Sequence, residues 1–509
     1  MNGETLRAAL GAIVGEAHVL ANDSARQLGS SDLFQWPEAV VADLVVRPGS
    51  TAELAQVTAL LSRSGSAIVP RGAGLSYTAG AVPHAAAVVI DCLRLDSIVI
   101  HADDLYAVVG AGVTWEKLAQ ALKPHGLRAA QINPISGSHS TVGGTASQNI
   151  PGGLDNIIGL TVVLADGTVA RTGSAARAGA SGFLRYAGPD LTGMFLGDCG
   201  AFGLKAEVVV RLAVEGDTAF ASFSFQRVDD MLAALVTLRR RDLVKRAFSM
   251  DQLKGRSATK VDVAEAAGVV SAVFKEAGSM GRALRDLAQL ARGRYVLNDA
   301  GWSLHMTAEA PSALIAEAQI ELARAVCRAG GQEIDNVIPK TMRAKPYSVR
   351  GMVGPEGERW VPVHCILPLS RAQACMTDLL GRIEQESGAL TAAGINVSYM
   401  ISSSGPYVTI EPMFYWKDSL DAIHLAHLSE RNQARFGGAA VNEAARALVR
   451  RLRGELRELM QKHDAQHAQL GRFYPYMPLL EPGAQALAAR IKDALDPARC
   501  MNPGVLGLS

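Results

Sequence analysis

The sequence lacks an excess charge of either sign, paired cysteines and long apolar runs, and each absence excludes a class of protein. Its 50 Lys and Arg balance 49 Asp and Glu, so no global field would attract nucleic acid or an anionic membrane. Six widely spaced cysteines contain no CxxC pair, which argues against a disulfide framework and fits a reducing cytoplasm. No uncharged apolar run approaches the roughly 18 residues of a membrane span. We therefore expect a cytoplasmic protein whose partner is a small molecule.

The composition that remains is that of an ordinary globular chain. Apolar residues make up 49% and charged residues 19% of the sequence, so intrinsic disorder is not expected. A chain of 509 residues is too long for one hydrophobic core and predicts two or three domains, with room for a large cofactor.

Predicted strands and helices alternate in the first part of the chain. A strand at 39–48, a helix at 51–65 and a strand at 66–72 form a βαβ beginning. Asp166-Gly167 separates two β-rich runs and predicts a tight hairpin turn. From Glu215 onward, strands interleave with amphipathic helices, which predicts a separate α+β domain.

A first glycine-rich segment, Arg71 to Ser76, follows directly after the strand residues Ile68, Val69 and Pro70. Glycines let successive backbone N–H groups turn inward into a concave anion site, and the Ser76 hydroxyl adds a donor. The segment lacks the GxGxxG spacing that opens a helix in dinucleotide folds. It is a candidate pyrophosphate cradle, or simply a turn after a strand.

Two further segments are rich in glycine. The stretch 134–149 combines glycines with hydroxyl residues, so its backbone could lie flat against a planar ligand while donating hydrogen bonds. The stretch 188–204 places Gly197, Gly200 and Gly203 before a strand. Two such glycine-rich segments indicate a ligand site more strongly than one segment alone.

In this order, the segments resemble the FAD-binding domain of the vanillyl-alcohol oxidase / p-cresol methylhydroxylase family. Arg71 to Ser76 is similar to its RGxGxS loop, and 134–149 to its P…STxGGxxAxN segment, with Ser147 in the usual Ala place. The stretch 188–204 resembles GPDLTGLFxGSxGxxGI, and the closing 496–508 resembles DPxGxxNPGK. The resemblance implies that FAD is contacted by Pro70, Arg71, Gly72, Ala73, Gly74, Leu75, Ser76, Gly80, Pro134, Ser140, Thr141, Gly143, Gly144, Ser147, Asn149, Gly200, Gly203, Leu204 and Asn502.

The resemblance implies an α+β fold with a two-subdomain FAD-binding domain of the p-cresol methylhydroxylase (PCMH) type and an α+β substrate (cap) domain that covers the flavin. We place these domains at 1–214 and 215–440, and expect 441–509 to return to the FAD domain. Members with histidyl-linked flavin carry His in the phosphate loop, where this chain has Leu75, Ser76 and Tyr77. We therefore expect noncovalent FAD, with His364 as the candidate for a link from the substrate domain.

The family's D-2-hydroxy-acid dehydrogenases bind a metal through HxGDGNxH and GEHG motifs. Aligned on this chain, the ligand positions fall on Ser404, Glu411 and Gln466. A divalent ion needs several imidazole or carboxylate donors, so no metal site is expected. His467 matches the histidine that these relatives use as a base, suited to taking a hydroxyl proton while a hydride moves to flavin N5. The alternative is a histidine without a catalytic role.

The family's phenol-oxidising members hold the phenolate with a Tyr-Arg pair, for which Tyr474 and Arg472 offer similar chemistry in altered order. Glu411 and His364 complete the predicted lining. Two enzyme functions stay open, oxidation of an alcohol or 2-hydroxy acid and oxidation of a para-substituted phenol or aryl alcohol. A flavin-binding assembly or sensing protein is the non-enzymatic alternative. The electron acceptor stays open among oxygen, a quinone, a cytochrome and an electron-transfer protein, and similar enzymes are commonly homodimers.

Overall fold

The computed structural model describes residues 2–130, 134–148, 150, 154–253, 301–347 and 352–508. The chain divides into two compact units. Over the described residues, no helix combines the length and apolar character needed to cross a membrane. The six cysteines are free and buried. Unit 1 comprises Met1–Glu215, Leu420–Gln433 and Ala468–Ser509, and unit 2 comprises Gly216–Ser419 and Ala434–His467.

These units differ from the expected domains in the C-terminal part of the chain. The expected segment 441–509 is divided at His467, and its first part belongs to unit 2. Helix α17 (Glu443–Gln461) accounts for this, because its buried residues include Val449, Leu452 and Leu456 and it packs against α13 (Ala372–Glu384) of the same unit. A separate stretch, 420–433, leaves unit 2 and belongs to unit 1.

The first sheet of unit 1 has the strand order β1-β2-β4-β3, and β2, β4 and β3 run parallel. Helix α3 (Thr51–Arg63), capped by the Ser50 side chain, buries Leu54, Val57 and Leu61 at helical spacing, and the predicted βαβ beginning is confirmed. Helix α1 (Gly3–Val14) contributes Leu10 and Val14 to the same core. The strands are β1 (Val19–Leu20), β2 (Leu44–Val46), β4 (Ala87–Asp91) and β3 (Ala67–Arg71).

The second sheet of unit 1 is antiparallel, with the order β5-β6-β10-β8-β9 and β7 paired to β10. The predicted hairpin at Asp166-Gly167 is confirmed, because Gly167 has φ +88° and its N–H donates to the Leu164 carbonyl at 2.9 Å. The strands are β5 (Ile98–His101), β6 (Tyr106–Gly110), β7 (Leu127–Ala129), β8 (Ile157–Val163), β9 (Val169–Arg171) and β10 (Leu204–Val214). The helices of unit 1 further include α2 (Asp23–Gly29), α4 (Trp115–Leu122), α5 (Val142–Ser147), α6 (Leu191–Met194), α15 (Ala422–Ala426) and α18 (Pro482–Leu495).

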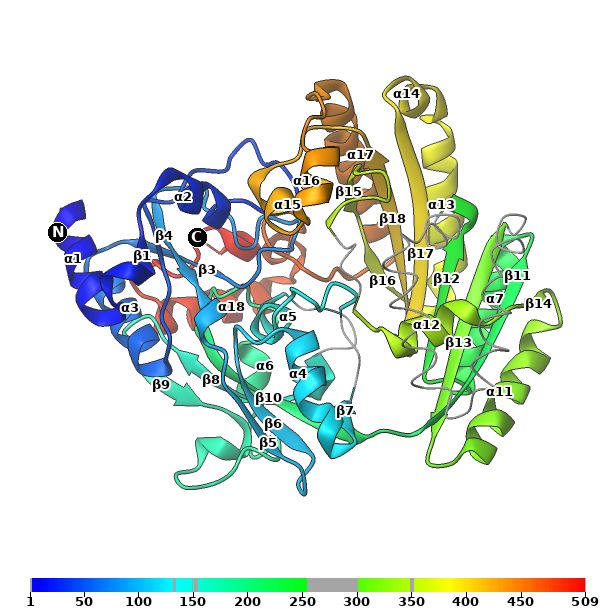
Figure 1. Cartoon of the computed structure of the whole chain (residues 1–509), viewed down its shortest axis with the longest axis horizontal. Helices are drawn as coiled ribbons and strands as arrows, with labels where there is room; N and C mark the ends of the chain where they lie inside the picture. Colours follow the sequence, from blue (N-terminus) through cyan, green and yellow to red (C-terminus); the bar gives the residue numbers. More distant parts are fainter. Residues whose placement is uncertain are drawn as a thin grey trace. The chain divides into compact units, whose positions relative to one another are not determined.

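Unit 2 is built on an eight-stranded antiparallel sheet of order β14-β11-β13-β12-β17-β18-β15, with β16 also on β18. Figure 1 shows the two longest of its strands, β17 and β18, side by side. The strands are β11 (Asp217–Phe225), β12 (Arg246–Asp251), β13 (Trp302–Ala310), β14 (Gln332–Ile334), β15 (Arg359–Pro362), β16 (Cys365–Pro368), β17 (Ile395–Gly405) and β18 (Tyr407–Trp416). The other described helices are α7 (Val228–Arg240), α11 (Ala313–Cys327), α12 (Val337–Ala344), α14 (Ser387–Ala392) and α16 (Glu430–Phe436), the last of which crosses the unit boundary.

The two faces of this sheet differ in chemistry. Paired residues of neighbouring strands share a face, since side chains alternate along a strand. One face carries the fully buried row Leu304, Ser249, Ile401, Ile410 and Cys365, and α11 lies on it because Cys327 contacts the neighbouring Met306 sulfur at 3.7 Å. The opposite face, named here the polar face, carries Ser222, His305, Phe248, Ser402, Thr409 and Ile366.

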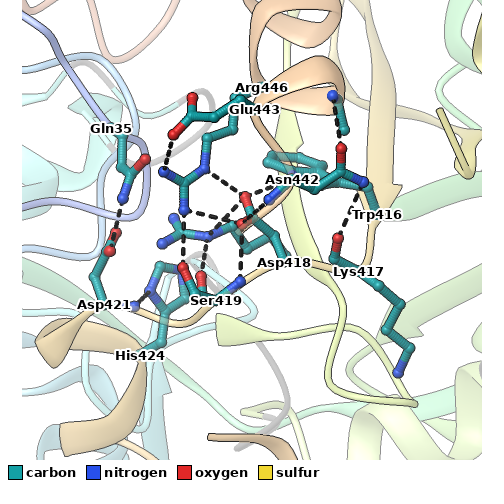
Figure 2. A network of polar contacts seen from close by, with 12 residues as sticks. Gln35, Trp416, Lys417, Asp418, Ser419, Asp421, His424, Asn442, Glu443 and Arg446 are labelled. Atoms are coloured by element: carbon teal, nitrogen blue, oxygen red, sulfur yellow. Dashed lines mark hydrogen bonds and ion pairs between the residues drawn. The ribbon is translucent and has the colours of Figure 1, made fainter. Parts of the chain in front are cut away.

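A buried carboxylate fixes the chain where it leaves β18 (Figure 2). Asp418, fully buried, accepts hydrogen bonds from Arg446 at 2.7 and 2.9 Å, from the Trp416 indole at 2.9 Å and from the Asn442 N–H at 3.0 Å. Burial disfavours the charged form, but these bonds outweigh it and hold the pKa of Asp418 below its ordinary value. The contacts tie the end of β18 to the start of α17.

Candidate cofactor site and catalytic groups

The first glycine-rich loop leaves β3 in a conformation that requires glycine. Gly74 has φ +75°, and a Cβ there would run into the Arg71 guanidinium. Arg71 is buried and donates to the Ser31 carbonyl at 2.5 Å. Burial lowers the pKa of Arg71 to about 10 against the opposing charges of Asp91 and Asp32, so the guanidinium remains charged at neutral pH.

The first and second glycine-rich segments meet in unit 1. A Cβ on Gly72 would lie 2.5 Å from the Thr141 hydroxyl, and one on Gly80 would lie 2.6 Å from the Gln148 amide nitrogen. Thr141 caps α5 by accepting the Gly144 N–H at 3.0 Å. At Gly144 a Cβ would meet only that hydroxyl among the described atoms within 4 Å. The backbone at Gly144 is thus accessible, as a flat ligand resting on glycine requires.

The third segment joins the same assembly. The Gly197 and Cys199 N–H groups donate to the Ala146 and Ser147 carbonyls, both at 2.8 Å. Gly200 has φ +77°, and a Cβ there would strike the Pro70 ring. The three segments, separated in sequence, therefore form one backbone-built cradle, and these residues fit a large anionic cofactor such as FAD.

Asn502 closes the cradle from the C-terminal loop. It is 1% exposed, and its side-chain amide donates to the Gly80 carbonyl at 2.8 Å and the Cys199 carbonyl at 2.7 Å. Its own N–H donates to the Ile68 carbonyl at 2.8 Å. Asn502 thus joins the chain on either side of the first segment, at Ile68 and Gly80, to the third segment at Cys199, which is a positioning role.

Arg472 and Tyr474, the candidates for holding a phenolate, are engaged within unit 1. The Arg472 guanidinium donates to the Ala79 carbonyl at 2.6 Å, the Pro503 carbonyl at 2.7 Å and the Asn502 side chain at 2.8 Å. Tyr474 is 1% exposed, and its ring lies edge-on to Phe473 with 4.7 Å between centroids. These contacts support a structural role for both residues.

The other predicted cofactor residues lie along the same loops, except Asn149, which lies outside the described residues. The buried Ser76 hydroxyl contacts Thr78 at 3.1 Å and Gln469 at 3.3 Å. Three of these residues are buried: Gly143, Gly203 and Leu204. Half-buried positions are occupied by Gly72, Ala73 and Leu75 of the first loop and by Pro70, Pro134, Ser140 and Ser147.

Sequence reasoning missed Asp32, which fixes the far end of the first loop. Its fully buried carboxylate accepts the Ala79 N–H at 2.9 Å, the Trp36 indole at 3.0 Å and the Phe34 N–H at 2.9 Å. The one local sequence signal for this role is that an aspartate side chain can accept the N–H of the residue two positions later, and this feature is common to many turns. Gln469, which bonds Tyr77 at 2.9 Å and the Gln148 carbonyl at 2.5 Å, carries no motif.

Three predicted catalytic residues come together in unit 2. The register that pairs Pro362 with Met413 and Cys365 with Ile410 sets His364 opposite Glu411, on the polar face. Beside this strand, Gln466 pairs with Ile366 through backbone hydrogen bonds of 2.8 and 2.9 Å. The following residue, His467, bonds the His364 carbonyl at 2.9 Å.

The contacts of His467 define its protonation. A carbonyl only accepts, so Nδ1 carries the proton, and Nε2 faces the Gln461 amide nitrogen at 3.4 Å with its lone pair. Burial lowers the pKa of His467 to about 4, and burial with the neighbouring His467 lowers the pKa of His364 to about 3. Both rings are therefore neutral at neutral pH. Within the described residues, no three His, Cys, Asp or Glu side chains gather as a metal site.

Comparison with known proteins agrees with the cradle. Residues 42–173 match the FAD binding domain family. Over 212 residues the chain is 30% identical to glycolate oxidase subunit GlcD of Bacillus subtilis, covering 38% of this chain and 43% of that protein. Over 228 residues it is 28% identical to the mitochondrial D-lactate dehydrogenase (cytochrome) of Arabidopsis thaliana, covering 43% and 39%. The chain thus spans less than half the length of these relatives.

Solved structures extend the likeness of fold to the whole chain. Substrate-bound p-cresol methylhydroxylase superposes with a TM-score of 0.73 at 16% identity, over 99% of this chain and 97% of that one. The isoeugenol complex of 4-ethylphenol oxidase from Gulosibacter chungangensis gives 0.73 at 17% identity, over 100% and 98%. The expected α+β fold is confirmed. Residues 42–173 thus match an FAD binding domain, and the fold of the chain is similar to that of p-cresol methylhydroxylase and 4-ethylphenol oxidase.

Proposed function

We propose that the protein is an FAD-dependent oxidoreductase that oxidises a CH–OH donor, an alcohol or 2-hydroxy acid, with bound FAD as the hydride acceptor. The observation that carries the proposal is the convergence of three glycine-rich segments and Asn502 on one cradle within a matched FAD binding domain. The likeness to a glycolate oxidase subunit and to D-lactate dehydrogenases supports the donor class.

The chain's own residues divide the work. The backbone of the first loop and Arg71 would hold the phosphates, and the Gly143-Gly144 segment would support the flavin side of the cofactor. His467 would take the donor's hydroxyl proton at Nε2, which bears the lone pair. A pKa of about 4 keeps this ring deprotonated at neutral pH, although it also makes the ring a weaker base than an ordinary imidazole.

A second candidate function is oxidation of a para-substituted phenol or aryl alcohol. It is favoured by the fold of p-cresol methylhydroxylase and 4-ethylphenol oxidase. The contacts of Arg472 weigh against the phenol function, because the Arg472 guanidinium already donates hydrogen bonds to Ala79, Pro503 and Asn502. A flavin-binding assembly or sensing protein is the non-enzymatic alternative.

Anaerobic mixing of the FAD-loaded protein with a panel of donors tests the proposal. We expect lactate or glycolate to bleach the flavin absorbance, and vanillyl-type alcohols to leave it unchanged. Bleaching by the aryl alcohols alone would move the function to the phenol class, and no bleaching by any donor would favour the non-enzymatic alternative.

We further propose that the FAD is noncovalent, because the first loop carries Leu75, Ser76 and Tyr77 where a histidyl link would attach. Acid precipitation should release the yellow cofactor into the supernatant. Flavin fluorescence that stays with the denatured polypeptide contradicts this.

A further inference from the structure

The polar face of the unit 2 sheet carries a cation that no described carboxylate neutralises. Arg246 opens β12, opposite Thr307 of β13, and its side chain is half-buried. No described residue forms an ion pair with Arg246. Burial lowers the pKa of Arg246, opposed by Tyr347. A partly desolvated guanidinium is costly unless an anion compensates it, so this position suits a negatively charged ligand.

A stack of rings holds Arg246 on this face. Its guanidinium carbon lies 5.9 Å from the centre of the Phe248 ring, within the range of a cation–π contact. Phe248 in turn lies against His305, with 5.1 Å between centroids. Both nitrogens of the fully buried His305 contact serine hydroxyls, Ser222 at 2.9 Å and Ser303 at 3.0 Å. The guanidinium is therefore presented from a preorganised support.

We propose that Arg246 binds the carboxylate of a 2-hydroxy-acid substrate. The inference rests on the proposed function and narrows its donor class from alcohols in general to acids. A guanidinium is planar and offers parallel N–H donors that match the two oxygens of a carboxylate, a fit that a neutral alcohol lacks.

The charges along the polar face give such a substrate a direction. Glu411 lies on β18, opposite Met400 of β17, and β17 separates β18 from β12. An acid on this face is attracted by Arg246 and repelled by Glu411. Between them lie the hydroxyl residues Ser402 and Thr409, which pair across β17 and β18 and can bond the rest of a polar substrate. We therefore expect the substrate carboxylate at Arg246 on β12 and the substrate hydroxyl toward Glu411 and His364.

Titration of the FAD-loaded protein with oxalate tests the inference without turnover, because oxalate has two carboxylates and no CH–OH group. We expect Arg246→Met, which keeps length but removes charge, to weaken oxalate binding by about 10- to 100-fold, as loss of a charged hydrogen-bonding partner predicts. Arg246→Lys should recover part of the loss. Arg227→Ala is the matched control, since the exposed Arg227 pairs only with Asp229 among the described residues, and its affinity should stay unchanged.

Donor comparison separates failure of this inference from failure of the proposed function. In Arg246→Met, the rate of anaerobic flavin reduction at low donor concentration should fall about 10- to 100-fold with lactate and by much less with propane-1,2-diol, its counterpart without a carboxylate. Equal oxalate affinity in variant and unsubstituted protein, or equal losses with both donors at unchanged flavin content, overturns the inference and leaves the proposed function standing. Failure of every CH–OH donor to reduce the unsubstituted protein overturns both.

Discussion

The candidate ligand-binding surfaces of unit 1 and unit 2 are built from different parts of the residues, backbone in one and side chains in the other. In unit 1 the cradle is made of backbone, shaped by glycines with positive φ such as Gly74 and Gly200 and tied by Asn502. In unit 2 the candidate groups are side chains, such as Arg246 and His364, brought to one face by the pairing of β12, β17, β18 and β16. The cradle should therefore be sensitive to any added side-chain atom, and the polar face to the loss of particular functional groups.

The largest expected effect comes from adding a side chain to the cradle. Gly74→Val forces a β-branched residue to φ +75° and into the Arg71 guanidinium. We expect protein that is colourless or unstable, measured as the flavin absorbance per polypeptide after purification.

The matched control adds a side chain in unit 2. Gly454 lies within α17, and a Cβ there meets no described atom within 4 Å. Gly454→Ala should keep full flavin content and raise stability by about 0.5–1 kcal/mol, as expected for glycine replaced in a helix. Normal flavin content in Gly74→Val would contradict the placement of the cofactor.

The next effect tests a functional group of unit 2. If His467 takes the hydroxyl proton, His467→Ala should bind FAD normally and slow anaerobic flavin reduction by about 10²- to 10⁴-fold. Tyr474→Phe, which changes a buried residue of unit 1, is the comparison. A near-normal His467→Ala beside a crippled Tyr474→Phe would favour the phenol function.

The smallest effect concerns a residue that holds unit 2 together without contacting ligand. Asp418→Asn removes the charge that Arg446 and Arg359 share and should lower the free energy of unfolding by about 1.5–3 kcal/mol. Because the folded-state pKa of Asp418 is lowered, its contribution is present above the unfolded pKa of about 4 and is lost as pH falls through the lower folded value. Thermal denaturation should therefore show the two proteins converging in acid.

An exposed carboxylate provides the control for this experiment. Glu458 is 66% exposed and pairs with Arg457 at 3.4 Å, so Glu458→Gln should change the free energy of unfolding by less than about 0.5 kcal/mol. A loss as large as that of Asp418→Asn would show that charge removal alone, rather than the buried network, governs the stability.

The same difference between the units decides what the sequence could predict. Gly74, Thr141 and Gly200 lie in short motifs whose backbone demands are local, so the cradle was predictable. The role of Asp32 could not be predicted from the sequence, because it depends on a hydrogen bond to Ala79, 47 positions away. Arg246 could not be selected as a binding residue from the sequence, because that role depends on which face of the sheet its side chain lies on. The face depends on the register of β12, which is set by the neighbouring strands. The sequence did not predict the unit boundary at His467. Helix α17 packs through an amphipathic apolar face, and a helix in either domain could have such a face.

The placement of Asn502 sets an order of events during synthesis. Its amide bonds the Gly80 carbonyl, 422 positions earlier in the chain. At roughly 5–20 residues per second, a ribosome needs roughly 20–80 s to add that much chain. During that interval the second and third glycine-rich segments are added, and Asn502, which bonds the Gly80 and Cys199 carbonyls, comes last. The bonds from Asn502 to the Gly80 and Cys199 carbonyls can therefore form only at a late stage of synthesis, well after the glycines of the cradle have been added.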